Sequence, residues 1–280
     1  MKRLHTMLIT VVPDIARYAQ ESGVDTLFID METRGKAERQ GHLDTHKSAH
    51  TYADVARIAA VLTEAELMVR INPPWEGTSA EVDAAIDAGA QRLMLPMFRH
   101  VAEVAEFKRA VAGRVPVTLL VETSASLARL PLILPLLEVE DRVHFGLNDL
   151  CLDMRLDFLF EVLGGRMLDG PTSFCREAGI PFGIGGVGCI GQGVVPAEWI
   201  LSEHVRLGSE WVILSRAFHG GAESLPALLA RLDLANELNV MQRCYRQLAM
   251  TAPNVLAANQ ASLALRAAAV NGQYQQPRVA

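Results

Sequence analysis

The chain has 280 residues, half of them hydrophobic and 21% charged, which is typical of a folded globular protein and suits the length of one (β/α)8 barrel. Its formal net charge of −6 comes without a clustered basic stretch, which argues against nucleic-acid and membrane-surface partners. Prolines interrupt its richest apolar stretch, and its four cysteines are irregularly spaced, so we expect no membrane span, reduced thiols and a cytoplasmic location.

Eight short apolar runs, rich in β-branched residues, alternate with segments of helical period. This alternation predicts repeated βα units around parallel strands, and eight such units close a TIM (β/α)8 barrel of the α/β class. The expected strands are residues 6–11, 25–30, 66–71, 92–96, 117–122, 142–147, 181–186 and 211–215.

Segments of helical period lie between the strands. Thr51 and Asp54 predict a capping box at the start of one of them. The expected helices include residues 52–62, 80–88, 101–111 and 197–206.

The chain continues well beyond the last expected strand. We divide it into a barrel domain at residues 1–221, C-terminal helices at 222–270 and a loose tail at 271–280. The added helices either complete the barrel or bury an apolar face against a neighbouring subunit, which predicts a homo-oligomer.

Polar residues follow several of the strands, at the barrel end where TIM-barrel active sites lie. Glu122 follows strand five and Asp149 follows strand six, and adjacent strands lie about 4.8 Å apart. Two carboxylates at this separation could share one hard divalent cation, Mg²⁺ or Mn²⁺. The alternative is that each one caps a helix or pairs with an arginine.

Asp30, Glu32 and Arg70 are the candidate catalytic residues at the ends of strands two and three. The guanidinium of Arg70 could hold a substrate carboxylate and an enolate oxygen, while one of the two carboxylates orients it. The other interpretation is a salt bridge between Arg70 and Asp30 or Glu122, with Asp30 and Glu32 as rim charges.

Three histidines, His42, His46 and His50, follow strand two at four-residue spacing. Gly41 and the capping box at Thr51 argue against a helix there, and therefore against a three-histidine zinc site. A single histidine from this loop, for which we take His46, is the candidate acid or base.

Glycines make up six of the eleven residues at 183–193, which could cradle a phosphate or form a floor without side chains beside the substrate. None of the four lysines (Lys2, Lys36, Lys47 and Lys108) ends a strand, so a Schiff-base aldolase is disfavoured. The substrate-binding residues expected beside Arg70 are Pro96, Leu147, Asn148 and Gly186.

The motifs FIDME, VRINP, AGAQRLMLP, VETSASL and HFGLNDLCLDM occur in this order between residues 20 and 216. Together they resemble the HpcH/HpaI aldolase and citrate lyase beta-subunit family. The resemblance implies that Glu122 and Asp149 hold the cation, that Arg70 holds the carboxylate and enolate oxygen of an oxo acid, and that the protein is a homo-trimer or homo-hexamer.

Two positions depart from the family pattern. Thr33 stands where the aldolase branch has a histidine, and Met97 stands where the citrate lyase branch has a lysine. We therefore expect a metal-dependent carbon-carbon lyase, aldolase or citrate-lyase-like, that acts through the enolate of pyruvate or a related 2-oxo acid. The alternatives are an acyl-CoA thioester lyase or hydrolase and a silent binding subunit. The second reactant is left open between an aldehyde, a sugar and a CoA thioester.

Overall fold

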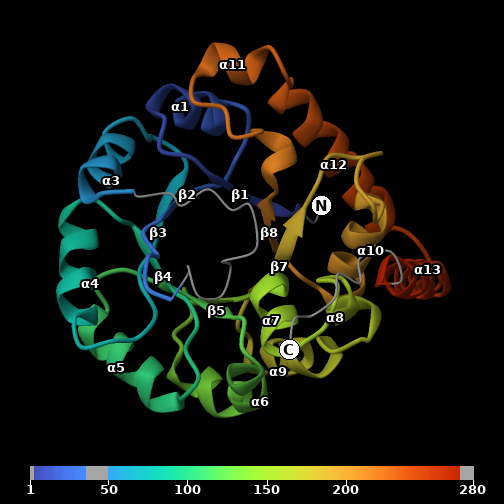
Figure 1. Cartoon of the computed structure of the whole chain (residues 1–280), viewed down its shortest axis with the longest axis horizontal. Helices are drawn as coiled ribbons and strands as arrows, with labels where there is room; N and C mark the ends of the chain where they lie inside the picture. Colours follow the sequence, from blue (N-terminus) through green and yellow to red (C-terminus); the bar gives the residue numbers. More distant parts are fainter. Residues whose placement is uncertain (1–2, 36–49, 272–280) are drawn as a thin grey trace, which may run out of the picture.

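The computed structural model describes residues 3–35 and 50–271, and in them eight parallel strands close into one barrel in the order β1 to β8. β1 pairs with β8, so the sheet has no free edge, and the predicted TIM barrel is confirmed (Figure 1). The strands are β1 (His5–Ile9), β2 (Thr26–Asp30), β3 (Glu66–Arg70), β4 (Arg92–Leu95), β5 (Val117–Val121), β6 (Arg142–Phe145), β7 (Phe182–Val187) and β8 (Trp211–Leu214).

Helices surround the strands on all sides (Figure 1), as burial of both faces of a parallel sheet requires. The predicted capping box is confirmed: Thr51 accepts from the Asp54 backbone, and the Asp54 side chain accepts in return. The helices around the barrel are α1 (Pro13–Glu21), α3 (Tyr52–Ala59), α4 (Thr78–Asp87), α5 (Val101–Val111), α6 (Ser124–Ile133), the 3-10 turn η1 (Leu134–Leu136), α7 (Leu147–Asp153), α8 (Glu161–Gly164), α9 (Asp169–Ala178), α10 (Ala197–Leu207) and the 3-10 turn η2 (Arg216–Phe218).

The sixth strand is shorter than expected from the sequence. It ends at Phe145, and Leu147 already begins α7, so Asn148 and Asp149 lie in the first turn of a helix instead of at a strand end. Gly146 is the residue that ends the strand and caps the helix. Asp149 therefore reaches the barrel end from a helix.

Apolar side chains fill the middle of the barrel interior. Met7, Phe28, Met68, Met94 and Leu120 come from five successive strands and form a cluster separate from the rest of the core. They alternate along each strand with residues that face the helices, as the two-residue period of a strand dictates.

A charged cluster lies below this layer, at the N-terminal end of the strands. Glu66 accepts from Arg92 at 2.9 Å and from Arg142 at 2.9 Å, and the Arg142 guanidinium stacks 3.6 Å from the Trp211 ring. Burial, and then the nearby charge of Arg92, lowers the pKa of Arg142 to about 10. Large side chains thus fill this end of the barrel, and the opposite end is the place for a site.

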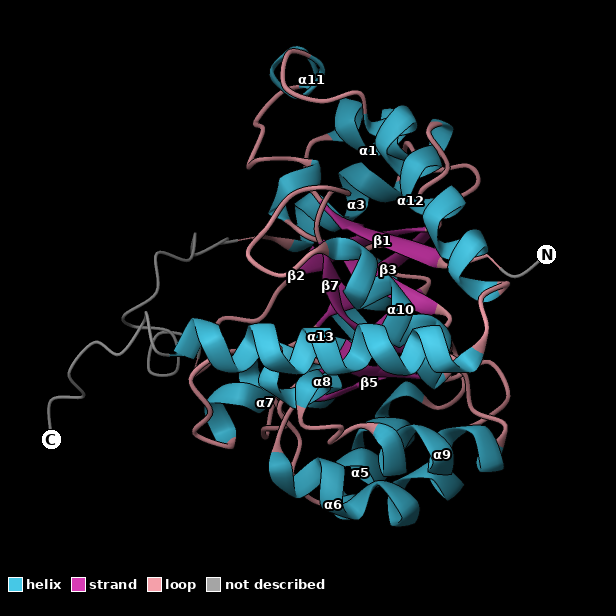
Figure 2. Cartoon of the chain, turned by 90° about the vertical axis from the view of Figure 1, so that its right-hand side faces the viewer, coloured by secondary structure: helices cyan, strands magenta, loops and turns pink. Residues whose placement is uncertain are grey.

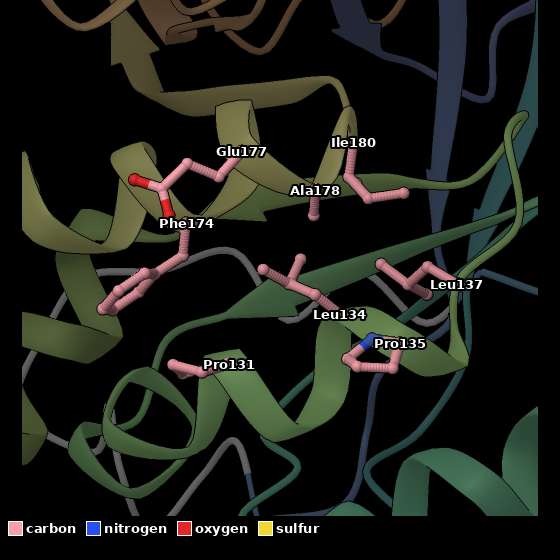
Figure 3. A pocket seen from close by; sticks show the side chains of 8 residues that line it. All are labelled: Pro131, Leu134, Pro135, Leu137, Phe174, Glu177, Ala178 and Ile180. Atoms are coloured by element: carbon pink, nitrogen blue, oxygen red, sulfur yellow. The ribbon is translucent and has the colours of Figure 1, made fainter.

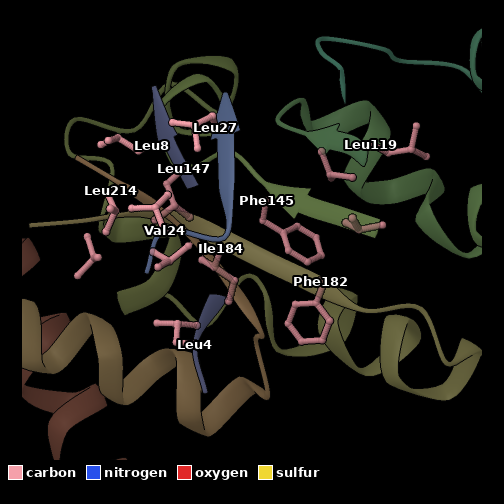
Figure 4. Packing of buried hydrophobic residues seen from close by; sticks show 14 of the residues in the cluster. Leu4, Leu8, Val24, Leu27, Leu119, Phe145, Leu147, Phe182, Ile184 and Leu214 are labelled. Atoms are coloured by element: carbon pink, nitrogen blue, oxygen red, sulfur yellow. The ribbon is translucent and has the colours of Figure 1, made fainter. Parts of the chain in front are cut away.

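The main hydrophobic core lies between the strands and the ring of helices. Figure 4 shows part of it, with Phe145 and Phe182 on neighbouring strands. Their rings meet edge to face, with centroids 6.0 Å apart. This contact joins β6 and β7 on the side of the strands that faces the helices.

The chain ends in three further helices, α11 (Leu225–Leu229), α12 (Leu234–Ala249) and α13 (Pro253–Asn271). α11 contacts α1 and α12 contacts α10, while α13 lies across α10 and α8 on the outside of the barrel (Figure 2). In the described part of the chain, no helix has both the length and the apolar character needed to cross a membrane.

Candidate active site

Arg70 and Asp30 form the central contact at the C-terminal end of the barrel. They are register partners at the ends of β3 and β2. Arg70 donates through Nε to Asp30 Oδ1 at 2.8 Å and through Nη2 to Asp30 Oδ2 at 2.6 Å. The salt bridge expected as one interpretation of Arg70 is therefore present, and it aligns the guanidinium with the barrel mouth.

Glu32 is the second acidic partner of Arg70. Its Oε2 lies 3.5 Å from Arg70 Nη2, and its side chain is only 3% exposed. Burial alone would lower the pKa of Arg70, but Asp30, Glu32 and Glu122 together raise it above its ordinary value. Arg70 is thus a fixed positive charge, and it is bordered by three carboxylates, two from the end of β2 and one from the end of β5.

Glu122 directly follows β5 and is 3% exposed. Its Oε1 accepts a hydrogen bond from the Met97 backbone N–H at 3.1 Å. Burial raises its pKa well above the ordinary value, and the charge of Asp149 adds to this, against the opposing effect of Arg70. Glu122 and Asp149 are therefore close enough for the charge of Asp149 to act on Glu122.

A network at the other end of α7 holds the helix that carries Asp149. Asp153, the last residue of α7, accepts from the Ser124 backbone N–H at 2.7 Å and from Arg99 Nη2 at 2.5 Å. Ser124 stands two residues after Glu122, so this contact ties the two carboxylate-bearing segments together. The relative placement of Glu122 and Asp149 depends on it.

Gly146 provides the space that the Glu122 side chain occupies. A Cβ at Gly146 would lie 2.8 Å from Glu122 Oε2 and 2.9 Å from Glu122 Cβ. The φ of Gly146 is −84°, so the requirement for glycine here is steric and does not come from backbone strain.

The donors at this end of the barrel suit a hard divalent cation. Across residues 3–35 and 50–271, no three or more His, Cys, Asp or Glu side chains are grouped so that they could hold a metal by themselves. Mg²⁺ commonly uses one or two carboxylates and completes its shell with waters and substrate oxygens. Burial and the charge of Asp149 disfavour the ionisation of Glu122, and such an ion fits this arrangement because a cation relieves the repulsion.

The expected substrate-binding residues differ in exposure. Asn148 is exposed, Pro96 is buried beside the Met97 backbone, and Leu147 is 2% exposed. Leu147 fills the space above Gly185, where a Cβ would lie 2.6 Å from its Cδ1.

The glycine-rich segment begins inside β7, which includes Gly186. A Cβ at Gly183 would lie 2.3 Å from the Nδ1 atom of His144. Together with the contact at Gly185, this means that packing inside the barrel requires the first glycines of the segment.

Only one of the three candidate histidines lies within the described residues. His42 and His46 lie outside the described residues, and His50 immediately precedes the cap of α3. Lys108, on α5, pairs with Asp141 at 2.5 Å on the outer side of the barrel, in agreement with the argument against a Schiff base.

Sequence reasoning missed the groups that support Glu122. The backbone N–H of Met97 donates to Glu122, and Met97 has a φ of +54°, in the left-handed region. Neither this donor nor the space at Gly146 has a sequence motif. The MLP segment and the glycine before α7 could only have been flagged as neighbours of the expected ligands.

A pocket of about 370 Å³ lies outside the barrel, away from the candidate site (Figure 3). It is formed by the C-terminal ends of α6 and α9 together with η1, which lead into the starts of β6 and β7, so it faces the end opposite the candidate site. Its lining is mainly apolar: Pro131, Leu134, Pro135, Leu137, Phe174, Glu177, Ala178 and Ile180.

Comparison with known proteins bears on the family and the fold of the chain. The sequence matches the family described as HpcH/HpaI aldolase/citrate lyase over residues 8–158, more than half of the chain. Two similar solved structures are the HpcH/HpaI aldolase of Desulfitobacterium hafniense DCB-2 (TM-score 0.59, 16% identity, 76% of this chain and 86% of that one) and an HpcH/HpaI aldolase/citrate lyase family protein of Burkholderia cenocepacia J2315 (TM-score 0.58, 18% identity, 88% and 94%). At these identities the structures show the fold alone. No curated protein matches the chain.

Gly146→Ala should lower the free energy of unfolding by roughly 1–3 kcal/mol, because the added methyl group meets Glu122 in a packed site. Gly170→Ala in α9 is the matched control, since a Cβ there meets nothing within 4 Å. Urea unfolding measures both changes. Equal stability of the two variants would show that Gly146 is not needed to make room for Glu122.

Proposed function

Because the chain belongs to the HpcH/HpaI aldolase/citrate lyase family, we propose that it is a Mg²⁺- or Mn²⁺-dependent carbon-carbon lyase that acts through the enolate of pyruvate or a related 2-oxo acid. The observation that carries the proposal is the buried carboxylate Glu122, with the charge of Asp149 beside it and the fixed cation Arg70 next to both. A lyase of this kind must stabilise negative charge on an oxygen next to a carboxylate. Glu122 and Asp149 could hold the cation that does so, and Arg70 could pair with the carboxylate.

Glu122 and Asp149 are the proposed ligands of the cation. When bound, a divalent cation supplies Lewis-acid stabilisation of the developing enolate oxygen. Glu122 keeps one oxygen on the Met97 N–H, which orients its carboxylate. Asp149 is held by the attachment of α7 to Ser124 and Arg99 through Asp153. The ligand pair is thus positioned before the substrate arrives.

Arg70 is the proposed partner of the substrate carboxylate. Asp30 accepts from Nε and Nη2 of the guanidinium. The edge at Nη1 is therefore the one that we propose binds a substrate oxygen. Asp30 is therefore a positioning residue. Glu32, buried beside Arg70, is a further proposed catalytic residue, and His46 is the proposed acid or base from the loop.

The second proposal concerns assembly. α13 buries Leu263 and Ala267 against the barrel, yet its outer side carries Leu265 at 74% and Val255 at 43% exposure. A helix that is apolar on both sides requires cover on the outside, and a further copy of the chain provides it. We propose a homo-trimer or homo-hexamer that uses α13.

Light scattering at micromolar concentration should give a mass of three or six chains, and Leu265→Glu should reduce it because the charge disrupts an apolar contact. A strictly monomeric wild type would contradict the assembly proposal and leave the lyase proposal untouched.

Glu122→Gln and Asp149→Asn should each weaken Mg²⁺ binding at least tenfold, since each removes one negative charge from the ligand pair at nearly constant size. Calorimetric titration of Mg²⁺ measures the affinity, and a thermal melt verifies folding. The matched controls are the exposed Glu106→Gln on α5 and Asp87→Asn on α4. Folded variants of Glu122 and Asp149 that bind Mg²⁺ like the wild type would overturn the proposed function.

Arg70→Lys should weaken the binding of oxalate, a planar dianion that resembles the pyruvate enolate, by roughly 2–4 kcal/mol in the presence of Mg²⁺. An ammonium cannot contact Asp30 through two N–H groups and still donate to a ligand from a defined edge. Arg114→Lys, which alters an outer arginine paired with Asp83, is the control. Unchanged oxalate affinity in Arg70→Lys would limit Arg70 to a structural ion pair.

A further inference from the structure

The C-terminal helix α13 is fastened to the barrel by side-chain hydrogen bonds. Asn259 Nδ2 donates to the hydroxyl of Ser202 on α10 at 3.1 Å. Gln260 Nε2, on the next residue, donates to the backbone carbonyl of Gly164, the last residue of α8, at 2.9 Å. Hydrogen bonds are directional, so these contacts fix where α13 lies on α8 and α10 more closely than apolar packing alone would.

α8 and α13 also approach each other closely at one point. A Cβ at Gly164 would lie 3.0 Å from Ala264 Cα, a backbone atom that cannot turn away. The absence of a side chain at Gly164 thus brings the two helices together and places its carbonyl within reach of Gln260. The last carbonyl groups of a helix have no partner inside the helix, and the Gln260 amide satisfies one of those of α8.

The position of α8 depends on α13. α8 has only four residues, Glu161–Gly164, and a single turn of helix is not stable by itself. Its most extensive contacts are with α13, and it also contacts α7. Figure 1 accordingly shows α8 between α7 and α13, and Figure 2 shows α13 lying over it. The outer helix therefore supports the helix that carries Asp149 through α8.

The turn between α7 and α8 is stiff enough to pass this support on. Cys151 on α7 is joined to Leu156 twice, since the Leu156 N–H donates to the Cys151 carbonyl at 2.9 Å and the Cys151 thiol donates to the Leu156 carbonyl at 3.4 Å. Glu161, the first residue of α8, accepts through Oε1 from the Phe158 N–H at 2.7 Å. Both ends of the turn are thus fixed, and Asp149 lies two residues before Cys151.

α7 needs this second support. Asp153, its last residue, accepts from the Ser124 backbone N–H at 2.7 Å and so holds one end of the helix. A helix fastened at one point can still pivot about that point, and a pivot of α7 would move Asp149 relative to Glu122. Contact with α8 restricts the pivot.

We propose that α13 is a positioning element of the cation site. Through Gly164 and Gln260 it holds α8, and α8 holds α7, which sets the distance of Asp149 from Glu122. The inference rests on the proposed role of Asp149 as a cation ligand, and it names a part of the chain outside the barrel mouth on which the cation affinity depends. Loosening α13 should therefore weaken the site without changing its ligands.

Two variants loosen this contact. Gly164→Ala places a methyl group against Ala264, and Gln260→Glu replaces the amide donor by a carboxylate, which cannot donate to the Gly164 carbonyl. In each, the Mg²⁺ affinity measured by calorimetric titration should fall roughly tenfold, the lower end of the loss expected when a group behind a metal ligand is removed. Gly170→Ala on α9, where a Cβ meets nothing within 4 Å, and the exposed Gln247→Glu on α12 should bind like the wild type.

Backbone hydrogen exchange without added cation tests the link between the helices by itself. In both variants the α7 amides of Leu150 and Cys151 should exchange faster than in the wild type, while the Thr172 amide on α9 should not. A thermal melt verifies folding, and Gln260→Glu, which adds no volume, decides the matter if Gly164→Ala does not fold.

Unchanged exchange in α7, or unchanged Mg²⁺ affinity in a folded variant, would limit α13 to covering the barrel and would overturn the inference. A wild type that binds no Mg²⁺ is a different result. It counts against the lyase proposal and removes the cation part of the inference, while the exchange rates in α7 still decide whether α13 holds this helix.

Discussion

The Glu122 carboxylate is buried next to a second carboxylate, Asp149, and the mouth of the barrel is built around this constraint. Taking like charges out of water is unfavourable, so the surroundings must compensate. The Met97 N–H and the charge of Arg70 do so in part, while burial and Asp149 still raise the pKa of Glu122. A bound divalent cation would offset the remaining repulsion between Glu122 and Asp149, and the same cation would supply the charge that an enolate oxygen needs.

The fold makes that arrangement possible. Closure of β1 on β8 brings eight strand ends into one ring, and the Glu66, Arg92 and Arg142 cluster fills the opposite end. Residues far apart in the chain then meet at the open end, and rigid contacts such as that between Asp30 and Arg70 hold them there. Catalytic groups on such a scaffold need little rearrangement when the substrate binds.

The alternation of apolar runs and helical segments was enough to predict the barrel, because burial of both sheet faces leaves a strong signal in every unit. Arg70, Asp30 and Glu122 could be predicted too, since a polar residue after a buried strand points to the barrel mouth. The start of α7 at Leu147 could not, because an apolar residue fits a strand and a helix equally well. The Met97 donor and the contact of Gln260 with α8 arise from backbone conformation and from tertiary packing, which no short motif records.

The central claim, that this barrel forms the enolate of a 2-oxo acid on a cation held by Glu122 and Asp149, is tested most directly by proton NMR of pyruvate in deuterium oxide. The wild type with Mg²⁺ should replace the methyl hydrogens by deuterium far faster than the buffer does, and removal of the cation by EDTA should stop the exchange. Exchange no faster than in buffer, with Mg²⁺ or Mn²⁺ present and the protein folded, would contradict the account.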